Sequence, residues 1–168
     1  MIRKLYPAES NSILRVILDA SQVYRGVIPD DRWKEPYMSA EELRGELDAG
    51  VQFYGWFEKD SLIGVMGIQP IKDTTLIRHS YVLHDNQRRG IGGLLLKHLL
   101  GLTKTPDVLV GTWEDVAGAI HFYEQHGFTL VSRRETNLLL QKYWCIPERQ
   151  IATSVVLKFN KQSSPAGS

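Results

Sequence analysis

The stretch that decides the fold of this chain runs from Leu76 to Lys97 and reads LIRHSYVLHDNQRRGIGGLLLK. Its pattern predicts a strand, then a glycine-rich turn, then a helix. Gly90, Gly92 and Gly93 have no Cβ, so backbone N–H groups of the turn and of the first helical residues can converge on a negatively charged ligand. The helix dipole favours an anion at the same place. The stretch therefore predicts an anion site that a diphosphate would fit.

The spacing excludes two common glycine-rich phosphate motifs. A Walker A loop needs Lys followed by Ser or Thr after its last glycine, whereas Leu94 and Leu95 follow Gly93 here. A dinucleotide fingerprint needs a third glycine, where this chain has Leu95, and an acidic residue about 20 residues on in a parallel unit. We therefore expect neither nucleotide triphosphate hydrolysis nor dinucleotide binding.

What the stretch does contain is Gln-x-x-Gly-x-Gly over residues 87–92, entered from a strand that ends at Val82. This closely resembles the acetyl-CoA signature of the GNAT N-acetyltransferase superfamily. The resemblance implies that main-chain groups at the strand end bind the pantetheine arm, and that backbone N–H groups of the turn hold the pyrophosphate. Gln87 is expected to shape the turn. Arg88 and Arg89 either add positive charge or are ordinary solvated arginines. The implied CoA site consists of Ser80, Tyr81, Val82, Gln87, Arg88, Arg89, Gly90, Ile91, Gly92 and Gly93.

Length and composition are those of one globular domain. The 168 residues are 43% hydrophobic and 23% charged, and 20 basic side chains face 19 acidic ones. The formal charge of +1 gives no argument for nucleic-acid binding. The single cysteine, Cys145, excludes an intrachain disulfide and a multi-thiolate metal site, and it has no nucleophile context. No run of about 18 apolar residues occurs, so we expect a cytoplasmic protein and no membrane partner.

The order of the expected elements supports the same resemblance. It matches the GNAT fold over residues 2–159, which implies an α/β (α+β) mixed sheet: a central, mostly antiparallel sheet of six to seven strands flanked by helices. We expect a single domain over residues 1–160 and a disordered tail over 161–168. The expected strands are 2–6, 51–58, 62–70, 74–83, 107–113, 128–132 and 151–159, and the expected helices are 8–24, one capped by Ser39 with Glu42, 90–102, 116–126 and 134–144.

A second segment, from Ala119 to Phe128, resembles the family's Ala-x-x-x-Tyr-x-x-x-Gly-Phe ending and places a tyrosine at position 123. When an amine attacks a thioester, the departing thiolate needs a proton, and a phenol that is neutral at pH 7 can donate it. We therefore assign Tyr123 as the general acid. The alternative is a tyrosine that only packs with Phe122 and Phe128.

Two positions depart from the family pattern. Val116 stands where many members have an asparagine that helps hold CoA, and Gly111 stands where some have a glutamate base. A different base, or a chain of water molecules, is then required. The candidates are His79, Glu114, Asp115, Glu35 and His121.

Two of these candidates have the best placement. His79 lies on the strand expected to receive the thioester, and an imidazole exchanges protons near neutral pH. By strand alternation it shares a face with Ile77 and Tyr81, so a structural histidine is the favoured alternative. Glu114 follows a strand end, where ligand crevices open in α/β folds, although such residues often interact with a helix dipole.

The acceptor pocket in this family is walled by the loop after the first helix and by the segment between the last two strands. Aromatic side chains around a carboxylate suit a cationic amine, although Trp33 and Tyr37 could instead fix the loop to the core. His121 and His126 are five residues apart on an expected helix, so their side chains lie on different faces and cannot bind one metal ion together. No metal is therefore expected. The candidate acceptor residues are Trp33, Glu35, Tyr37 and Met38 in the first segment, and Tyr143 and Trp144 in the second.

These patterns together predict an N-acetyltransferase that moves an acetyl group from acetyl-CoA to a small-molecule primary amine by direct attack in a ternary complex. Three alternatives stay open: a non-catalytic acyl-CoA-binding or sensing module, which Val116 and Gly111 favour, transfer of a longer acyl group, and acetylation of a protein amine. Edge strands near the C-terminus allow a possible homodimer.

Overall fold

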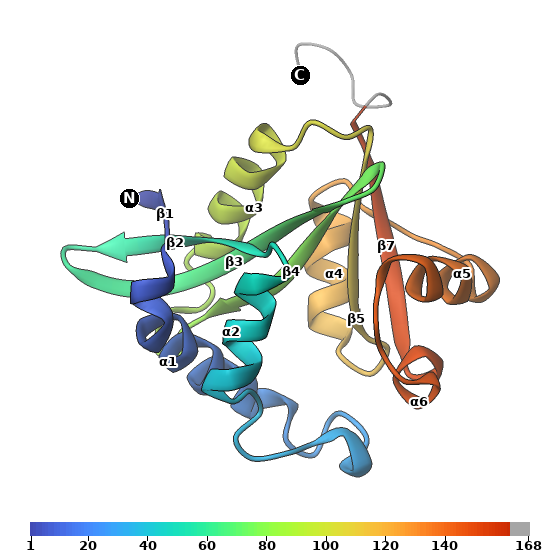
Figure 1. The fold of residues 1–168 in the computed structure, drawn as a ribbon, viewed down its shortest axis with the longest axis horizontal. Coiled ribbons are helices and arrows are strands. Elements are labelled where there is room, and N and C mark those ends of the chain that lie inside the picture. Colours follow the sequence, from blue (N-terminus) through green and yellow to red (C-terminus); the bar gives the residue numbers. More distant parts are fainter. Residues whose placement is uncertain (162–168) are drawn as a thin grey trace. The chain divides into compact units, whose positions relative to one another are not determined.

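The computed structural model describes residues 1–161 of the chain, so most of the predicted disordered tail lies outside the described residues. Hydrogen bonding gives a seven-stranded sheet in the order β1-β2-β3-β4-β5-β7-β6. The chain forms two compact units, one from residues 1–70 and 77–102 and the other from 71–76 and the residues after 102, each described separately below (Figure 1). The single domain predicted over residues 1–160 stays a prediction.

The first unit is an antiparallel meander with three helices. β1 pairs antiparallel with β2, and β2 pairs antiparallel with β3. The sequence predicted all of these elements with small shifts at their ends, and 3₁₀ turns extend α1 on both sides. The elements are β1 (Ile2–Lys4), α1 (Ser10–Ser21), α2 (Ala40–Asp48), β2 (Gln52–Glu58), β3 (Ser61–Ile71), β4 (Thr74–Val82, which begins in the second unit) and α3 (Ile91–Leu102).

Helices cover both faces of β3. On one face a hydrophobic core joins Ile17 of α1 and Leu43 of α2 to Phe53 of β2 and Val65 of β3. On the other face α3 approaches closely, since a Cβ added at Gly64 would lie 3.2 Å from Ile91 Cγ2. Two-sided burial explains why β3 is almost continuously apolar rather than alternating.

The predicted start of α2 is confirmed in detail. Ser39 has extended backbone, its hydroxyl accepts a hydrogen bond from the Glu42 N–H at 3.0 Å, and Glu42 Oε1 accepts one from the Ser39 N–H at 3.4 Å. This capping box satisfies two backbone donors that a helix start leaves open. It fixes where α2 begins and therefore which side chains face the sheet.

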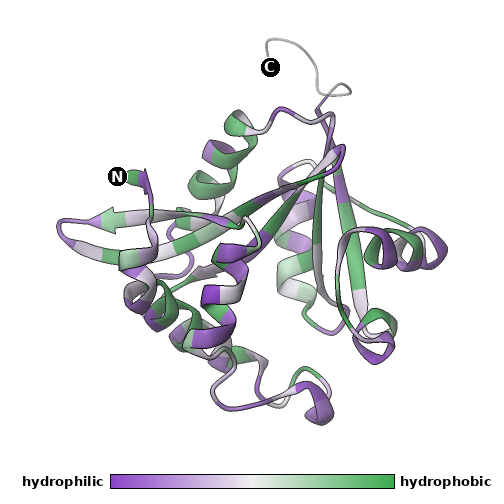
Figure 2. Ribbon diagram, viewed as in Figure 1, coloured by the Kyte–Doolittle hydropathy of each residue, from purple (hydrophilic) through white to green (hydrophobic). Residues whose placement is uncertain are grey.

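The second unit contains β5 (Asp107–Trp113), α4 (Ala117–Gln125), β6 (Thr129–Leu130), α5 (Arg133–Tyr143), α6 (Glu148–Ala152) and β7 (Ser154–Asn160). β7 pairs antiparallel with both β5 and β6. A hydrophobic cluster of Leu76, Leu109, Leu140 and Val156 joins α5 to these strands. Figure 2 shows the central part of β7 as hydrophobic, as expected for a strand that contributes to a core.

The final strand was predicted to begin at Ile151, and this was wrong. Residues 148–152 form α6, because Pro147 has the extended backbone of a helix N-cap and Glu148 favours a first helical turn. The Thr153 hydroxyl then donates to the Arg149 carbonyl at 2.9 Å, and β7 starts one residue later. The predicted strand 128–132 is also shorter, at two residues.

No helix in the described part of the chain combines the length and apolar character that a membrane crossing needs.

Leu43→Ala is expected to lower the free energy of unfolding by about 2–5 kcal/mol, because it leaves a cavity between α2 and the sheet. Leu43 is completely buried. Leu138→Ala serves as control, since Leu138 is 59% exposed and should cost far less. Urea unfolding monitored by circular dichroism measures both; equal losses would contradict the core described for α2.

Candidate active site

The turn between β4 and α3 is shaped by local hydrogen bonds and by two left-handed residues. Gln87 Nε2 donates to the Val82 carbonyl at 3.0 Å, which closes the turn as predicted for Gln87. Arg88 and Gly90 have φ angles of 64° and 82°. Left-handed residues in a tight turn direct neighbouring backbone N–H groups toward one side of the chain.

The start of α3 leaves backbone donors open for an anion. The Leu94 N–H donates to the Gly90 carbonyl at 3.0 Å, so Gly90 carries the first acceptor of the helix. The N–H groups that precede it in the first turn have no intrahelical acceptor. A Cβ at Gly90 would meet no atom within 4 Å, so the space around the turn is open. These residues fit the pyrophosphate group that the sequence implied.

The two arginines of the turn differ. Arg89 forms an ion pair with Glu58 at the end of β2, and this hydrogen bond holds the pKa of the Glu58 carboxyl below its usual value. Arg88, by contrast, has no ion pair with any residue that the structure describes. The positive charge that the turn adds to an anion site therefore rests more on Arg88 and the backbone than on Arg89.

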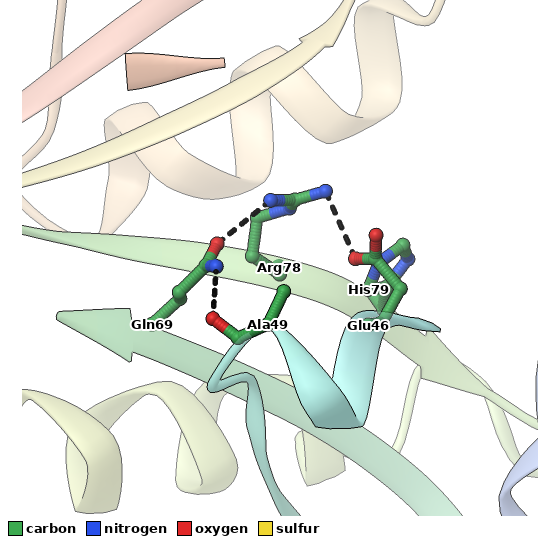
Figure 3. A network of polar contacts seen from close by, with 5 residues as sticks. All are labelled: Glu46, Ala49, Gln69, Arg78 and His79. Atoms are coloured by element: carbon green, nitrogen blue, oxygen red, sulfur yellow. Dashed lines mark hydrogen bonds and ion pairs between the residues drawn. The ribbon is translucent and has the colours of Figure 1, made fainter. Parts of the chain in front are cut away.

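His79 on β4 is the one base candidate held by a partly buried carboxylate. Its Nε2 lies 2.6 Å from Glu46 Oε2, and the side chains of the two residues are 15% and 26% exposed. Arg78 donates from NH2 to the same oxygen at 2.9 Å and from NH1 to Gln69 Oε1 at 2.8 Å. Gln69 in turn donates to the Ala49 carbonyl, which ties β3 and β4 to the end of α2 (Figure 3).

The Glu46 carboxyl is ionised in this network. Burial alone would raise its pKa, but the hydrogen bond with His79 and the electrostatic interactions with His79 and Arg78 outweigh burial, so the net pKa is lowered. Sequence reasoning missed Glu46. No local signal marks it, because it lies 33 residues before His79 on a helix whose other acidic residues are solvated.

The backbone at His79 breaks the strand pattern that the sequence analysis assumed. Its φ angle is 54°, in the left-handed region that non-glycine residues seldom adopt. Adjacent residues of a regular strand point to opposite faces. Here Arg78 and His79 reach the same carboxylate oxygen, which the left-handed backbone permits, and the His79 ring stacks on Phe53 at 5.9 Å.

Aromatic side chains from the loop after α1 gather at the end of β4. Tyr24 packs edge-on against Tyr37 at 5.6 Å and against Tyr81 at 6.2 Å, and Trp33 stacks on Tyr37 at 5.7 Å. Burial, together with Tyr24 and Tyr37, raises the pKa of the Tyr81 hydroxyl well above its ordinary value. Because Tyr37 also packs on the core of the first unit, the loop is fixed to that core.

The remaining candidates of the first unit are less well placed for proton transfer. Glu35 forms an exposed ion pair with Arg25 at 3.4 Å. Met38 is buried in the core rather than presented to a pocket. The aromatic loop is therefore present, but the Glu35 carboxylate is paired with Arg25 at the protein surface.

In the second unit, Tyr123 on α4 is 4% exposed. Its ring packs edge-on against Phe122 at 5.0 Å and against Phe128 at 5.4 Å. Gly127 follows the end of the helix with a φ angle of 89°. The packing that the alternative assigned to Tyr123 exists, and its role as general acid stays a prediction.

Three other sequence-based positions of the second unit, Trp144, Glu114 and Tyr143, have structural partners. Trp144 fills the space beside Gly111, because a Cβ there would lie 3.4 Å from the indole Cζ2. Trp144 thus packs on the hydrophobic cluster of this unit. Glu114 forms an ion pair with Arg133 at 3.1 Å, and both are exposed. Tyr143 donates to Asp73 at 2.7 Å.

Asp115 and His121 are exposed side chains. Within residues 1–161, no group of three or more His, Cys, Asp or Glu side chains is arranged to hold a metal ion.

The chain matches the model of a known protein family. The model of the acetyltransferase (GNAT) domain family matches residues 17–138, most of the chain. The chain belongs to the GNAT acetyltransferase family. Its matched range includes the glycine-rich turn, the Glu46–His79 pair and Tyr123. Comparison with curated proteins gives no match.

Solved structures show the same fold at low identity. The PaiA N-acetyltransferase of Thermoplasma acidophilum, solved in complex with coenzyme A, is 18% identical with a TM-score of 0.72 over 95% of this chain and 98% of its own. A GNAT acetyltransferase of Elizabethkingia anophelis with acetyl-CoA bound is 22% identical, with a TM-score of 0.63 over 95% and 97%. A ribosomal-protein-alanine N-acetyltransferase of Brucella melitensis is 16% identical, with a TM-score of 0.66 over 95% and 99%. The GNAT fold predicted from the sequence is confirmed.

Gly90→Ala is expected to weaken CoA binding about tenfold, because a Cβ disfavours the left-handed backbone that directs the N–H groups of the turn. Isothermal titration with CoA measures the change. Gly101→Ala in the same helix is the control, since Gly101 has no left-handed φ and open space around it. Unchanged affinity in Gly90→Ala would contradict an anion site built from this backbone.

The Glu46 pair is expected to stabilise the folded protein above the ordinary pKa of a glutamate and to lose this contribution as pH falls through the lowered folded-state pKa. Wild type should therefore lose more unfolding free energy than Glu46→Gln between about pH 6 and about pH 3. Urea unfolding at a series of pH values measures this, with Glu41→Gln on the same helix as control. Parallel curves for wild type and Glu46→Gln would contradict the ionised pair.

Proposed function

We propose that this GNAT protein is an N-acetyltransferase that moves an acetyl group from acetyl-CoA to a primary amine of a small molecule. The observation that supports this most is the backbone of the turn, where Arg88 and Gly90 adopt left-handed φ angles directly before the start of α3 at Ile91. Two structural neighbours were solved with coenzyme A or acetyl-CoA bound. In this proposal the turn binds the diphosphate of acetyl-CoA.

When bound, acetyl-CoA supplies an activated acetyl thioester. The imidazole of His79 accepts a proton from the substrate ammonium, which frees the nitrogen lone pair to attack the thioester carbonyl. A C–N bond forms and the C–S bond breaks. The Tyr123 hydroxyl donates its proton to the departing sulfur and regains one from the newly acylated nitrogen. The products are an amide and free CoA, and His79 passes the remaining proton to solvent.

His79 is preferred over Glu114 as the base for a physical reason. Glu114 is exposed, and its carboxylate is engaged in an ion pair with the Arg133 guanidinium. His79 is less exposed and is held through Nε2 by the Glu46 carboxylate, so its ring has a fixed position on β4. The departure at Gly111 is consistent with this choice, because Trp144 stands beside the position where other members carry a glutamate.

The aromatic cluster supports a cationic acceptor. Trp33, Tyr24, Tyr37 and Tyr81 present electron-rich ring faces and hydroxyls, and their rings lie within 6.2 Å of one another in successive pairs. The faces of such rings attract ammonium groups although the rings themselves carry no net charge. The proposal also includes a cytoplasmic location and a possible homodimer.

The test measures acetyl transfer from acetyl-CoA to a panel of small amines and to peptides with a free N-terminus or lysine. The peptides are included because one structural neighbour is a ribosomal-protein-alanine N-acetyltransferase. We expect small amines to be the better acceptors. Mass spectrometry of the co-purifying ligand reports the acyl chain. Ligand binding without any turnover would favour the sensing module instead.

Tyr123→Phe is expected to lower kcat by about 10²-fold or more while KM for acetyl-CoA stays similar, because only the proton donor is lost. Tyr6→Phe is the matched control, since Tyr6 is 57% exposed. Steady-state kinetics with the best amine measures both. An unaltered rate in Tyr123→Phe would contradict the role of the phenol.

A further inference from the structure

We infer that Glu46 is a positioning residue that fixes the tautomer and orientation of His79, so that Nδ1 of the imidazole is the nitrogen that accepts the substrate proton. This inference rests on the proposed role of His79 as the base. It adds Glu46, a residue of α2, to the proposed site.

The geometry of the pair defines which nitrogen is bonded. Glu46 Oε2 lies 2.6 Å from Nε2 of His79, within the range of a strong charge-assisted hydrogen bond. Both side chains are largely withdrawn from solvent, at 26% and 15% exposure, so water competes weakly for the bond. In Figure 3 the carboxylate of Glu46, on α2, lies beside the imidazole ring of His79 on β4.

The charge state of the carboxylate then fixes the proton on the ring. Arg78 donates to the same Oε2 atom at 2.9 Å, which keeps Glu46 ionised. An ionised carboxylate can only accept, so Nε2 of a neutral His79 must carry its hydrogen. The lone pair is then on Nδ1, which makes no hydrogen bond with any residue in the described range 1–161.

Two further contacts hold the ring in place. The His79 ring stacks on Phe53 of β2 with 24° between the planes. Gln69 of β3 holds Arg78 at 2.8 Å and is itself fixed to the Ala49 carbonyl at 3.0 Å. The His79 side chain thus contacts one carboxylate from α2 and one aromatic ring from β2, while the Arg78 guanidinium meets the same carboxylate and Gln69 holds Arg78. Of these contacts, the carboxylate is the one that accepts from Nε2.

The first measurement needs no activity. Two-dimensional ¹H–¹⁵N NMR of the imidazole nitrogens in ¹⁵N-histidine-labelled protein, with His79→Gln used for assignment, reports the tautomer. We expect the Nε2–H form in wild type and a mixture of the two tautomers in Glu46→Gln, whose amide can donate as well as accept. Glu41→Gln is the control and should leave the signals of His79 unchanged. An Nδ1–H tautomer in wild type, or the same spectrum in Glu46→Gln, would overturn the inference.

The second measurement separates positioning from a merely structural role. Glu46→Gln is expected to lower kcat about 10- to 100-fold, less than the whole contribution of a general base, with KM for acetyl-CoA unchanged. Glu46→Asp keeps the carboxylate and should recover part of the rate. This variant also allows the test to be made if Glu46→Gln does not fold.

The double variant decides how Glu46 acts. If Glu46 acts through His79, Glu46→Gln should cost nothing further in a His79→Ala background. The same fold-loss in both backgrounds would show a structural role and overturn the inference, as would a wild-type rate in His79→Ala. Absence of acetyl transfer by wild type to every amine would instead overturn the proposed function, and the NMR result would still decide whether Glu46 sets the tautomer.

Discussion

Burial of β3 on both faces is the constraint on which the rest of the first unit depends. The helices α1 and α2 pack on one face and α3 on the other, so the strand can contain almost no polar side chain. Gln69 is the exception near its end, and it is buried with both polar ends bonded. The core therefore sets the distance between α2 and β4, and with it the distance between a helix carboxylate and a strand imidazole.

The carboxylate of Glu46 shows how a charged group is tolerated where it is partly buried between α2 and β4. A half-buried charge is costly unless it is paired and hydrogen-bonded. Two cationic or potentially cationic partners meet one of its oxygens, and the left-handed backbone at His79 allows consecutive residues to do so. Backbone strain of this kind occurs mainly where the surroundings overdetermine it, often at functional sites. The same residues thus serve packing, charge balance and the proposed chemistry.

The family pattern and its departures can be understood from the same contacts. The turn before α3 contains the glycines of the family pattern and the glutamine whose side chain closes the turn. The backbone conformation of the turn depends on these residues. The strand position where other members carry a glutamate is Gly111, and a tryptophan side chain stands beside it. In the proposed mechanism the proton acceptor is therefore His79 on β4 rather than a side chain at this position.

The sequence by itself determined the order of the elements, the glycine-rich turn, the capping box at Ser39 and the tyrosine segment of α4, because each depends on local backbone preference or on a fixed spacing. It failed where local signals conflict, as at Ile151, whose β-branched side chain suggested a strand although Pro147 starts a helix. Only the tertiary structure decided the partner of His79. Glu46 lies 33 residues away, and no periodicity or motif relates two side chains that meet only because α2 packs over the sheet.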